Sequence, residues 1–155
     1  MVVVNRGENN NQNMFYGEYE YKIDEKGRIP LPPRFRKYFS KDGVVLTPGA
    51  ERCVTIYSVL DWQKLSNTLT TNALGRSKMR KLNRVLFATA FKTVIDNQGR
   101  IPIPAPLREH AGIGEDAVIA GANTYLEIWD KAAWEAEKQD SQDQAWQIIE
   151  SLEKT

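Results

Sequence analysis

Asp24-Glu25-Lys26-Gly27-Arg28-Ile29-Pro30-Leu31-Pro32 is repeated, in altered form, as Asp96-Asn97-Gln98-Gly99-Arg100-Ile101-Pro102-Ile103-Pro104. The two copies lie 72 positions apart (96 − 24). Further residues of similar type recur at the same offset: Arg36 and Arg108, Gly49 and Gly121, Val54 and Leu126, Ile56 and Ile128, and Trp62 and Trp134. We therefore infer that a whole structural unit is duplicated within the chain.

Each copy of the stretch is typical of a tight turn that presents an arginine. The aspartate can accept backbone N–H bonds inside the turn, and the glycine can take a positive φ and let a DNA strand come close. An arginine held in this way is a fixed, permanently charged fork able to grip phosphate or read the N7/O6 edge of guanine. This pattern predicts DNA contacts from Arg28 and Arg100, supplementary contacts from Lys26 and Gln98, and loops shaped by Asp24, Gly27, Asp96 and Gly99. The alternative is that each Asp–Arg pair is an ion pair that only shapes its turn.

The residues around the two turns predict the same order of elements twice. Polar and apolar residues alternate before each turn, which predicts a half-buried strand. The prolines after each turn confine the next extended segment to an edge and suit the start of a short helix. The predicted strands are Glu18–Ile23, Val44–Thr47 and Val54–Tyr57, with counterparts Phe91–Ile95, Ala117–Ala120 and Tyr125–Trp129. The predicted helices are Pro33–Ser40, Val59–Leu69, Ser77–Ala90, Pro106–Ala111 and Lys131–Glu137, followed by a polar stretch and a short amphipathic end at Trp146–Leu152.

This order predicts a protein that is mainly β with flanking helices, an α+β fold. A unit of about 45 residues cannot easily bury a core alone, so we expect the two units to interleave their strands about a pseudo-twofold axis. The predicted organisation is a flexible tail at 1–13, a first unit at 14–60, a helical connector at 61–90, a second unit at 91–134 and a C-terminal helix or tail at 135–155.

The net charge of +1 conceals a division of charge along the chain. Residues 1–92 contain 16 Lys+Arg against 8 Asp+Glu, whereas residues 93–155 contain 5 against 12. Such a division indicates either that one part meets a polyanion or that unlike faces of neighbouring subunits pack head to tail. One face of the predicted helix at 77–90 is basic, and this face is either solvated or in contact with phosphates.

Composition also argues against several classes of protein. Cys53 and His110 are the only cysteine and histidine, so one chain can form neither an internal disulfide nor a Cys/His metal cage. Nothing in the sequence joins them as a nucleophile and base, and Asp24 and Asp96 are better explained by their turns than as a catalytic dyad. No apolar run reaches the roughly 20 residues of a membrane helix, and we read no signal peptide. We therefore expect a cytoplasmic protein without enzymatic activity, cofactor or metal.

The chain resembles the MraZ family over Met14–Glu137. The resemblance lies in Met-Phe-x-Gly at Met14–Gly17, the doubled Asp-x-x-Gly-Arg, Leu107–Gly112 and Leu126–Asp130. It implies two fused units of the SpoVT-AbrB type, each contributing to a swapped-hairpin β-barrel. It also implies that the Asp-x-x-x-Arg motifs carry DNA binding, which maps onto Asp24 with Arg28 and Asp96 with Arg100.

The family further implies a nucleoid-associated bacterial transcription regulator, usually a repressor. The resemblance implies action on the promoter of the division and cell-wall gene cluster in which the protein is itself encoded. It also implies closed homo-oligomeric rings that bind tandem repeats in double-stranded DNA. Two features depart from the family: residues 1–13 precede the usual start, and Asn97-Gln98 replaces a lysine-bearing loop, so the two loops are expected to contribute unequally. The rival interpretations are an antitoxin of the same fold and a ring scaffold that binds a division protein.

Overall fold

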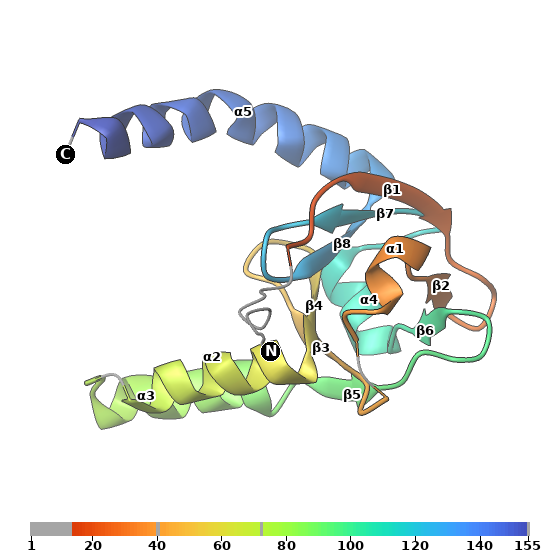
Figure 1. Ribbon diagram of the computed structural model, residues 1–155, viewed down its shortest axis with the longest axis horizontal. Coiled ribbons are helices and arrows are strands. Elements are labelled where there is room, and N and C mark those ends of the chain that lie inside the picture. Colours follow the sequence, from red (N-terminus) through yellow and green to blue (C-terminus); the bar gives the residue numbers. More distant parts are fainter. Residues whose placement is uncertain (1–13, 40, 72, 155) are drawn as a thin grey trace, which may run out of the picture.

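The computed structural model describes residues 14–39, 41–71 and 73–154. The tail predicted at 1–13 lies outside these residues. The chain forms a six-stranded antiparallel sheet, a separate two-stranded ribbon and flanking helices (Figure 1). This arrangement confirms the predicted α+β class.

The elements follow the same order in both halves of the chain. The first half contains β1 (Glu18–Lys22), β2 (Arg28–Pro30), α1 (Pro33–Arg36), β3 (Val44–Pro48), β4 (Val54–Ser58) and α2 (Val59–Thr71). The connecting helix consists of α3 (Arg76–Leu82) and one wider turn, η2 (Asn83–Phe87). The second half contains β5 (Phe91–Thr93), β6 (Arg100–Pro102), α4 (Ala105–Ala111), β7 (Asp116–Gly121), β8 (Leu126–Asp130) and α5 (Lys131–Glu153).

Strands of the two halves interleave within the large sheet. Its order is β1-β7-β8-β4-β3-β5, and every neighbouring pair is antiparallel. The order is the same when equivalent strands are read from either end, which places a pseudo-twofold axis between β4 and β8. Among the described strands, β1 pairs with β7 alone and β5 with β3 alone, so each half depends on the other to hold its first strand.

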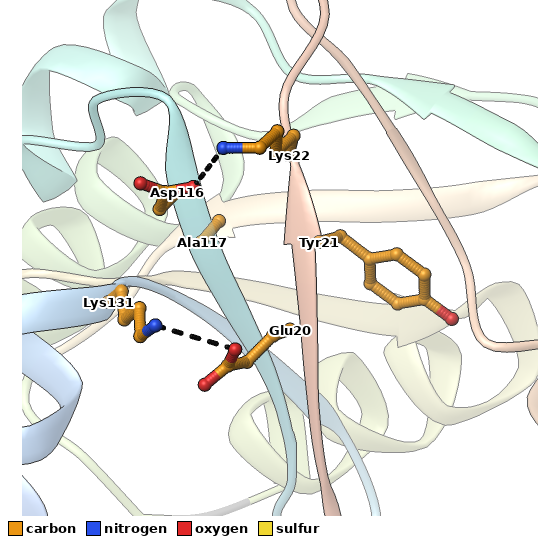
Figure 2. A pocket seen from close by; sticks show the side chains of 6 residues that line it. All are labelled: Glu20, Tyr21, Lys22, Asp116, Ala117 and Lys131. Atoms are coloured by element: carbon orange, nitrogen blue, oxygen red, sulfur yellow. Dashed lines mark hydrogen bonds and ion pairs between the residues drawn. The ribbon is translucent and has the colours of Figure 1, made fainter.

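The pairing of β1 with β7 illustrates the alternation predicted for β1 (Figure 2). The ring of Tyr21 points to the opposite side of the strand from Lys22 and Glu20. Lys22 Nζ lies 2.7 Å from Asp116, and Lys131 Nζ lies 3.5 Å from Glu20. These side chains are largely exposed, so each ion pair contributes little to the attachment of β1.

The ribbon joins the two copies of the repeated stretch. Ile29 lies opposite Ile101, and each arginine that begins a strand lies opposite a proline of the other strand. Both strands of a two-stranded ribbon are edges, so prolines without an N–H are tolerated there. The inner face of the ribbon belongs to the core, because Ile29, Leu31, Ile101 and Ile103 are at most 1% exposed.

Two helices differ from their predicted lengths. The regular part of α1 ends at Arg36 rather than near Ser40, because the next residues form tighter turns in which Tyr38 N–H and Phe39 N–H bond to carbonyls three residues back. Helix α5 continues to Glu153, whereas the sequence prediction ended it at Glu137. Residues 137–144 contain neither glycine nor proline and several good helix formers, so nothing in this polar stretch stops the helix.

The connecting helix also departs from the regular helix predicted at 77–90. After Leu82 it widens, and the N–H of Ala88 bonds to the carbonyl of Asn83 at 3.0 Å, five residues back. This wider turn places Phe87 against Trp62 of α2, with ring centroids 5.1 Å apart. Apolar periodicity predicted the helix correctly, but it could not reveal a one-residue expansion.

We expect Ile101→Ala to destabilise the fold by about 2–5 kcal/mol, since it removes a fully buried side chain shared by the ribbon and the sheet. Chemical denaturation followed by circular dichroism measures this free energy of unfolding. The matched control is Val94→Ala, at a side chain that is 57% exposed, for which we expect a change within about 0.5 kcal/mol. Equal stabilities of the two variants would contradict the assignment of the ribbon to the core.

Candidate nucleic-acid interface

Arg28 and Arg100 lie on the outer face of the ribbon. Side chains alternate along a strand, so the burial of Ile29 and Ile101 on the inner face turns both arginines outward. Figure 1 shows the ribbon at one end of the molecule, with α2, α3 and the end of α5 projecting toward the other. The fold therefore brings the two predicted arginines onto one surface.

Each arginine is preceded by a turn that an aspartate closes. One carboxylate oxygen of Asp24 accepts the N–H groups of Lys26 and Arg28, each at 2.9 Å. Asp96 accepts those of Gln98 and Arg100 at the same distances. The bond from the arginine N–H is the main cause that lowers the pKa of each aspartate below its ordinary value. The carboxylates are therefore ionised at neutral pH and hold both turns in the same shape.

The second carboxylate oxygen pairs with the arginine side chain. Arg28 Nε lies 2.8 Å from Asp24 Oδ2, and Arg100 Nε lies 3.0 Å from Asp96 Oδ2. The ion pairs of the alternative interpretation are thus present. They occupy only the Nε side of each guanidinium, however, and a guanidinium has five donors. The remaining Nη side can still bind a phosphate or a base edge.

The two arginines are not equivalent. Arg100 Nη1 also lies 3.7 Å from Asp24 Oδ2, so this guanidinium contacts the carboxylates of both loops. Among the described residues, the Nη atoms of Arg28 have no hydrogen-bond or ion-pair partner. The Arg28 side chain is 30% exposed and that of Arg100 is 24% exposed. Arg28 is thus the more available of the two.

Two further arginines support the loops, and the sequence interpretation gave them no role. A Cβ on Gly27 would collide with the guanidinium of Arg108, and a Cβ on Gly99 with that of Arg36. The side chain of Arg108 donates to the carbonyl of Ile103, and Arg36 Nε donates to that of Leu31 at 2.9 Å. The glycines, with φ near +79° and +78°, therefore leave room for an arginine of the other unit. The structure thus gives each glycine a role in packing that the sequence did not reveal. The recurrence of Arg36 and Arg108 at the 72-residue offset was the signal that could have identified the pair.

The tips of the loops differ in charge. Lys26 and Gln98 are both exposed, as are the preceding residues Glu25 and Asn97. Together with Arg28, Arg36, Arg100 and Arg108, Lys26 makes five cationic groups around the ribbon, against the three carboxylates of Asp24, Glu25 and Asp96. These eight side chains carry an excess of two positive charges, which suits a polyanion.

Among the described residues, Cys53 and His110 are not arranged as a catalytic nucleophile and base. The fold brings both to the turn between β3 and β4, where His110 Nε2 lies 3.1 Å from the carbonyls of Gly49 and Glu51. This nitrogen donates to backbone and is not available as a base for Cys53. Burial, reinforced by Glu127 and Glu51, raises the pKa of the buried Cys53 thiol to about 12.

The described part of the chain has neither a cluster of potential metal ligands nor a helix able to span a membrane. No group of three or more histidine, cysteine, aspartate or glutamate side chains there is arranged to hold a metal ion. None of the helices described has the length and apolar character needed to cross a membrane.

The fold and the ribbon define a duplicated α+β protein whose two halves jointly present an arginine-bearing surface. A family model described as "MraZ protein, putative antitoxin-like" matches residues 14–85 and again residues 86–151. The chain therefore belongs to the MraZ family, as the resemblance predicted. This family is not one of enzymes, so the chain is not an enzyme.

Curated relatives carry the same family name. A protein of Dehalococcoides mccartyi described as "Transcriptional regulator MraZ" is 55% identical over 141 residues, which cover 90% of this chain and 99% of the relative. Similarly described proteins are 44% identical in Roseiflexus castenholzii, covering 79% of this chain and 85% of the relative, and 39% identical in Salinispora tropica, covering 90% and 97%.

We expect Gly27→Ala to destabilise the protein by about 1–3 kcal/mol, because alanine at a positive φ is strained and the added Cβ displaces Arg108. The free energy of unfolding in urea measures the effect. Gly114→Ala is the matched control, since its Cβ would only touch Asp130 Oδ1 at an ordinary 3.8 Å. A Gly27→Ala protein as stable as the control would refute the proposed packing of Arg108.

The lowered pKa values of Asp24 and Asp96 predict an acid-sensitive fold. Because folding lowers them, the two carboxylates stabilise the fold fully above their unfolded pKa, about 4, and this stability is lost as the pH falls through the folded values. We expect the loss of melting temperature between pH 5 and pH 2.5 to be smaller in Asp24→Asn plus Asp96→Asn than in the wild type, while Asp143→Asn, on the exposed surface of α5, behaves as wild type. Parallel acid profiles for all three proteins would contradict this account.

Proposed function

We propose that this protein is a sequence-specific DNA-binding transcription regulator that reads DNA through the outer face of the β2–β6 ribbon. The observation that carries the proposal is that both Asp-anchored arginines lie on one face with a positive excess of charge. The descriptions of the relatives as transcriptional regulators support it independently.

A two-stranded ribbon that carries arginines is a suitable element for reading DNA. The major groove of B-form DNA admits a two-stranded β-ribbon, and an arginine can bind the O6 and N7 atoms of guanine with two hydrogen bonds. Arg28, whose Nη groups are the more available, is the principal reader in this proposal, and Arg100 is the second. Lys26 adds a phosphate contact from its exposed loop, and Gln98 adds a base or phosphate contact.

The more detailed proposal follows the family. The protein acts in the cytoplasm, on the nucleoid, as a repressor of the division and cell-wall gene cluster and of its own gene. Identical subunits form a closed ring and present their loops to tandem promoter repeats. A head-to-tail ring repeats one orientation, so direct repeats are expected, spaced by about one helical turn of 10 base pairs.

The proposed architecture is the swapped-hairpin β-barrel of SpoVT-AbrB proteins, built from both halves. Two observations support it: strands of the two halves interleave in the large sheet, and the ribbon packs its isoleucines into the same core. In this arrangement the arginine loops rest on a closed core, so the distance between the two readers is fixed before DNA binds.

The two rival functions make different demands on the protein. An antitoxin of this fold would need a disordered tail that wraps its toxin, but residues 131–153 form a helix. A ring scaffold for a division protein would use the loops as protein contacts and would show no sequence preference for DNA.

The deciding experiment is a salt-titrated binding assay on the DNA upstream of the protein's own gene. We expect Arg28→Ala plus Arg100→Ala to lower affinity roughly tenfold or more, since each arginine that reads a base is worth about 1–3 kcal/mol. Arg28→Lys plus Arg100→Lys should keep most of the salt dependence but lose discrimination against scrambled DNA, because lysine keeps the charge without the planar fork.

The matched control is Lys64→Glu, which makes the same change of two charge units at an exposed position of α2, a helix that projects away from the ribbon. We expect this variant to bind as wild type. The loop proposal fails if the double alanine variant of the ribbon binds with unchanged affinity and salt slope. Equal wild-type affinity for scrambled DNA would reduce the protein to a nonspecific DNA binder.

A further inference from the structure

The C-terminal part of α5 presents an exposed apolar face beyond the sheet. Near its start the helix packs on the body, where Trp134 contacts the ring of Trp129 with centroids 5.8 Å apart. The same side of the helix continues through Ala145 and Ile149. The exposed fractions of Trp146, Ile148 and Ile149 are 63%, 60% and 43%. Trp146 and Ile149 are three positions apart and share one face of the helix, whereas Ile148, two positions from Trp146, projects toward nearly the opposite side. An exposed tryptophan beside an exposed isoleucine is typical of a contact surface.

A complementary groove lies at the connecting helix. It runs between η2 and the turn at 48–50, and its volume is about 610 Å³. Leu82, Val85 and Leu86 supply an apolar lining, and Val85 is 59% exposed. Lys81 and Arg84 border the groove.

The helix end and the groove have opposite charges. Residues 139–153 carry four acidic side chains and no basic one, and residues 76–87 carry five basic side chains and no acidic one. Neither set forms an ion pair with a described residue of this chain, and Glu150 and Glu153 lie beside the apolar face of α5. Charge therefore favours the same pairing as apolar packing.

The helix end cannot fill the groove of its own chain. Figure 1 shows α5 leaving the sheet beside β1 and β8, while α2 and α3 lie at the other edge, beyond β3 and β5, with the end of α5 far from both helices. A helix of 23 residues is a rigid rod roughly 35 Å long, so its tip cannot turn back.

We propose that the apolar C-terminal end of α5 docks in the η2 groove of a second copy of this chain. The contact joins unlike surfaces, so it is head-to-tail, and each subunit keeps one helix end and one groove for further neighbours. This inference deepens the proposed ring by naming its interface. It is independent of the proposed DNA contact, because the ribbon lies at the opposite end of the molecule.

Mixing two complementary variants of the full-length chain tests the contact. Val85→Glu places an acid in the groove and leaves α5 intact, whereas Trp146→Ala plus Ile149→Ala truncates α5 and leaves the groove intact. All three positions are exposed, so the fold is expected to persist, which circular dichroism checks. We expect native mass spectrometry to find multi-subunit wild type, each variant alone as a monomer at the same micromolar concentration, and the mixture as a 1:1 dimer. Val94→Glu, at another exposed apolar site, should assemble as wild type.

A charge exchange within one chain provides a second test. Lys81→Glu plus Arg84→Glu should dissociate the assembly, and adding Glu150→Lys plus Glu153→Lys should restore it. A monomeric wild type, a variant that keeps the wild-type mass, or a mixture without the dimer would overturn the proposal. None of these measurements involves DNA, so they leave the roles of Arg28 and Arg100 to be judged separately.

Discussion

The structure depends on a pair of reciprocal backbone hydrogen bonds at the ends of the ribbon. The carbonyl of Gly27 accepts the N–H of Ile103, and the carbonyl of Gly99 accepts the N–H of Leu31, each at 2.8 Å. Each arginine turn is thus completed by the strand that follows the other turn. The same exchange recurs in the large sheet, where β1 and β5 are held by strands of the opposite half. Neither arginine turn could keep its shape if the two halves separated.

Within this symmetric frame, the two halves differ in their aromatic packing and in the lengths of their last helices. Phe15 packs against Phe35 and Phe39, whereas the positions equivalent to the last two are Leu107 and Ala111. Phe87, the counterpart of Phe15, contacts Trp62 instead. Helix α2 stops at Thr71, but its counterpart α5 continues to Glu153. The two halves have therefore diverged both in the core and in the helices that leave it.

The sequence predicted the strands and the turns because these depend on local rules: alternation, positive φ at glycine, and proline at edges. The interleaving followed from a different argument, that one unit is too small to bury a core alone. It could not predict the partners of Arg36 and Arg108, since these arginines pack against glycines that are distant in sequence. It also missed the unequal pairing of Arg100, which depends on the distance across the ribbon. The length of α5 was a different kind of error, because polarity was read as the end of a helix although polar helix formers do not end one.

The reciprocal closure of the turns has a consequence for synthesis on the ribosome. Arg28 emerges early, but the N–H that completes its turn belongs to Ile103, and the strand that holds β1 begins at Asp116. Contacts this distant in sequence form late, after most of the chain is available. A nascent or prematurely terminated chain that lacks the second half therefore carries the first arginine motif without its folded turn. Synthesis of a truncated product should not release a fragment that competes with the complete protein.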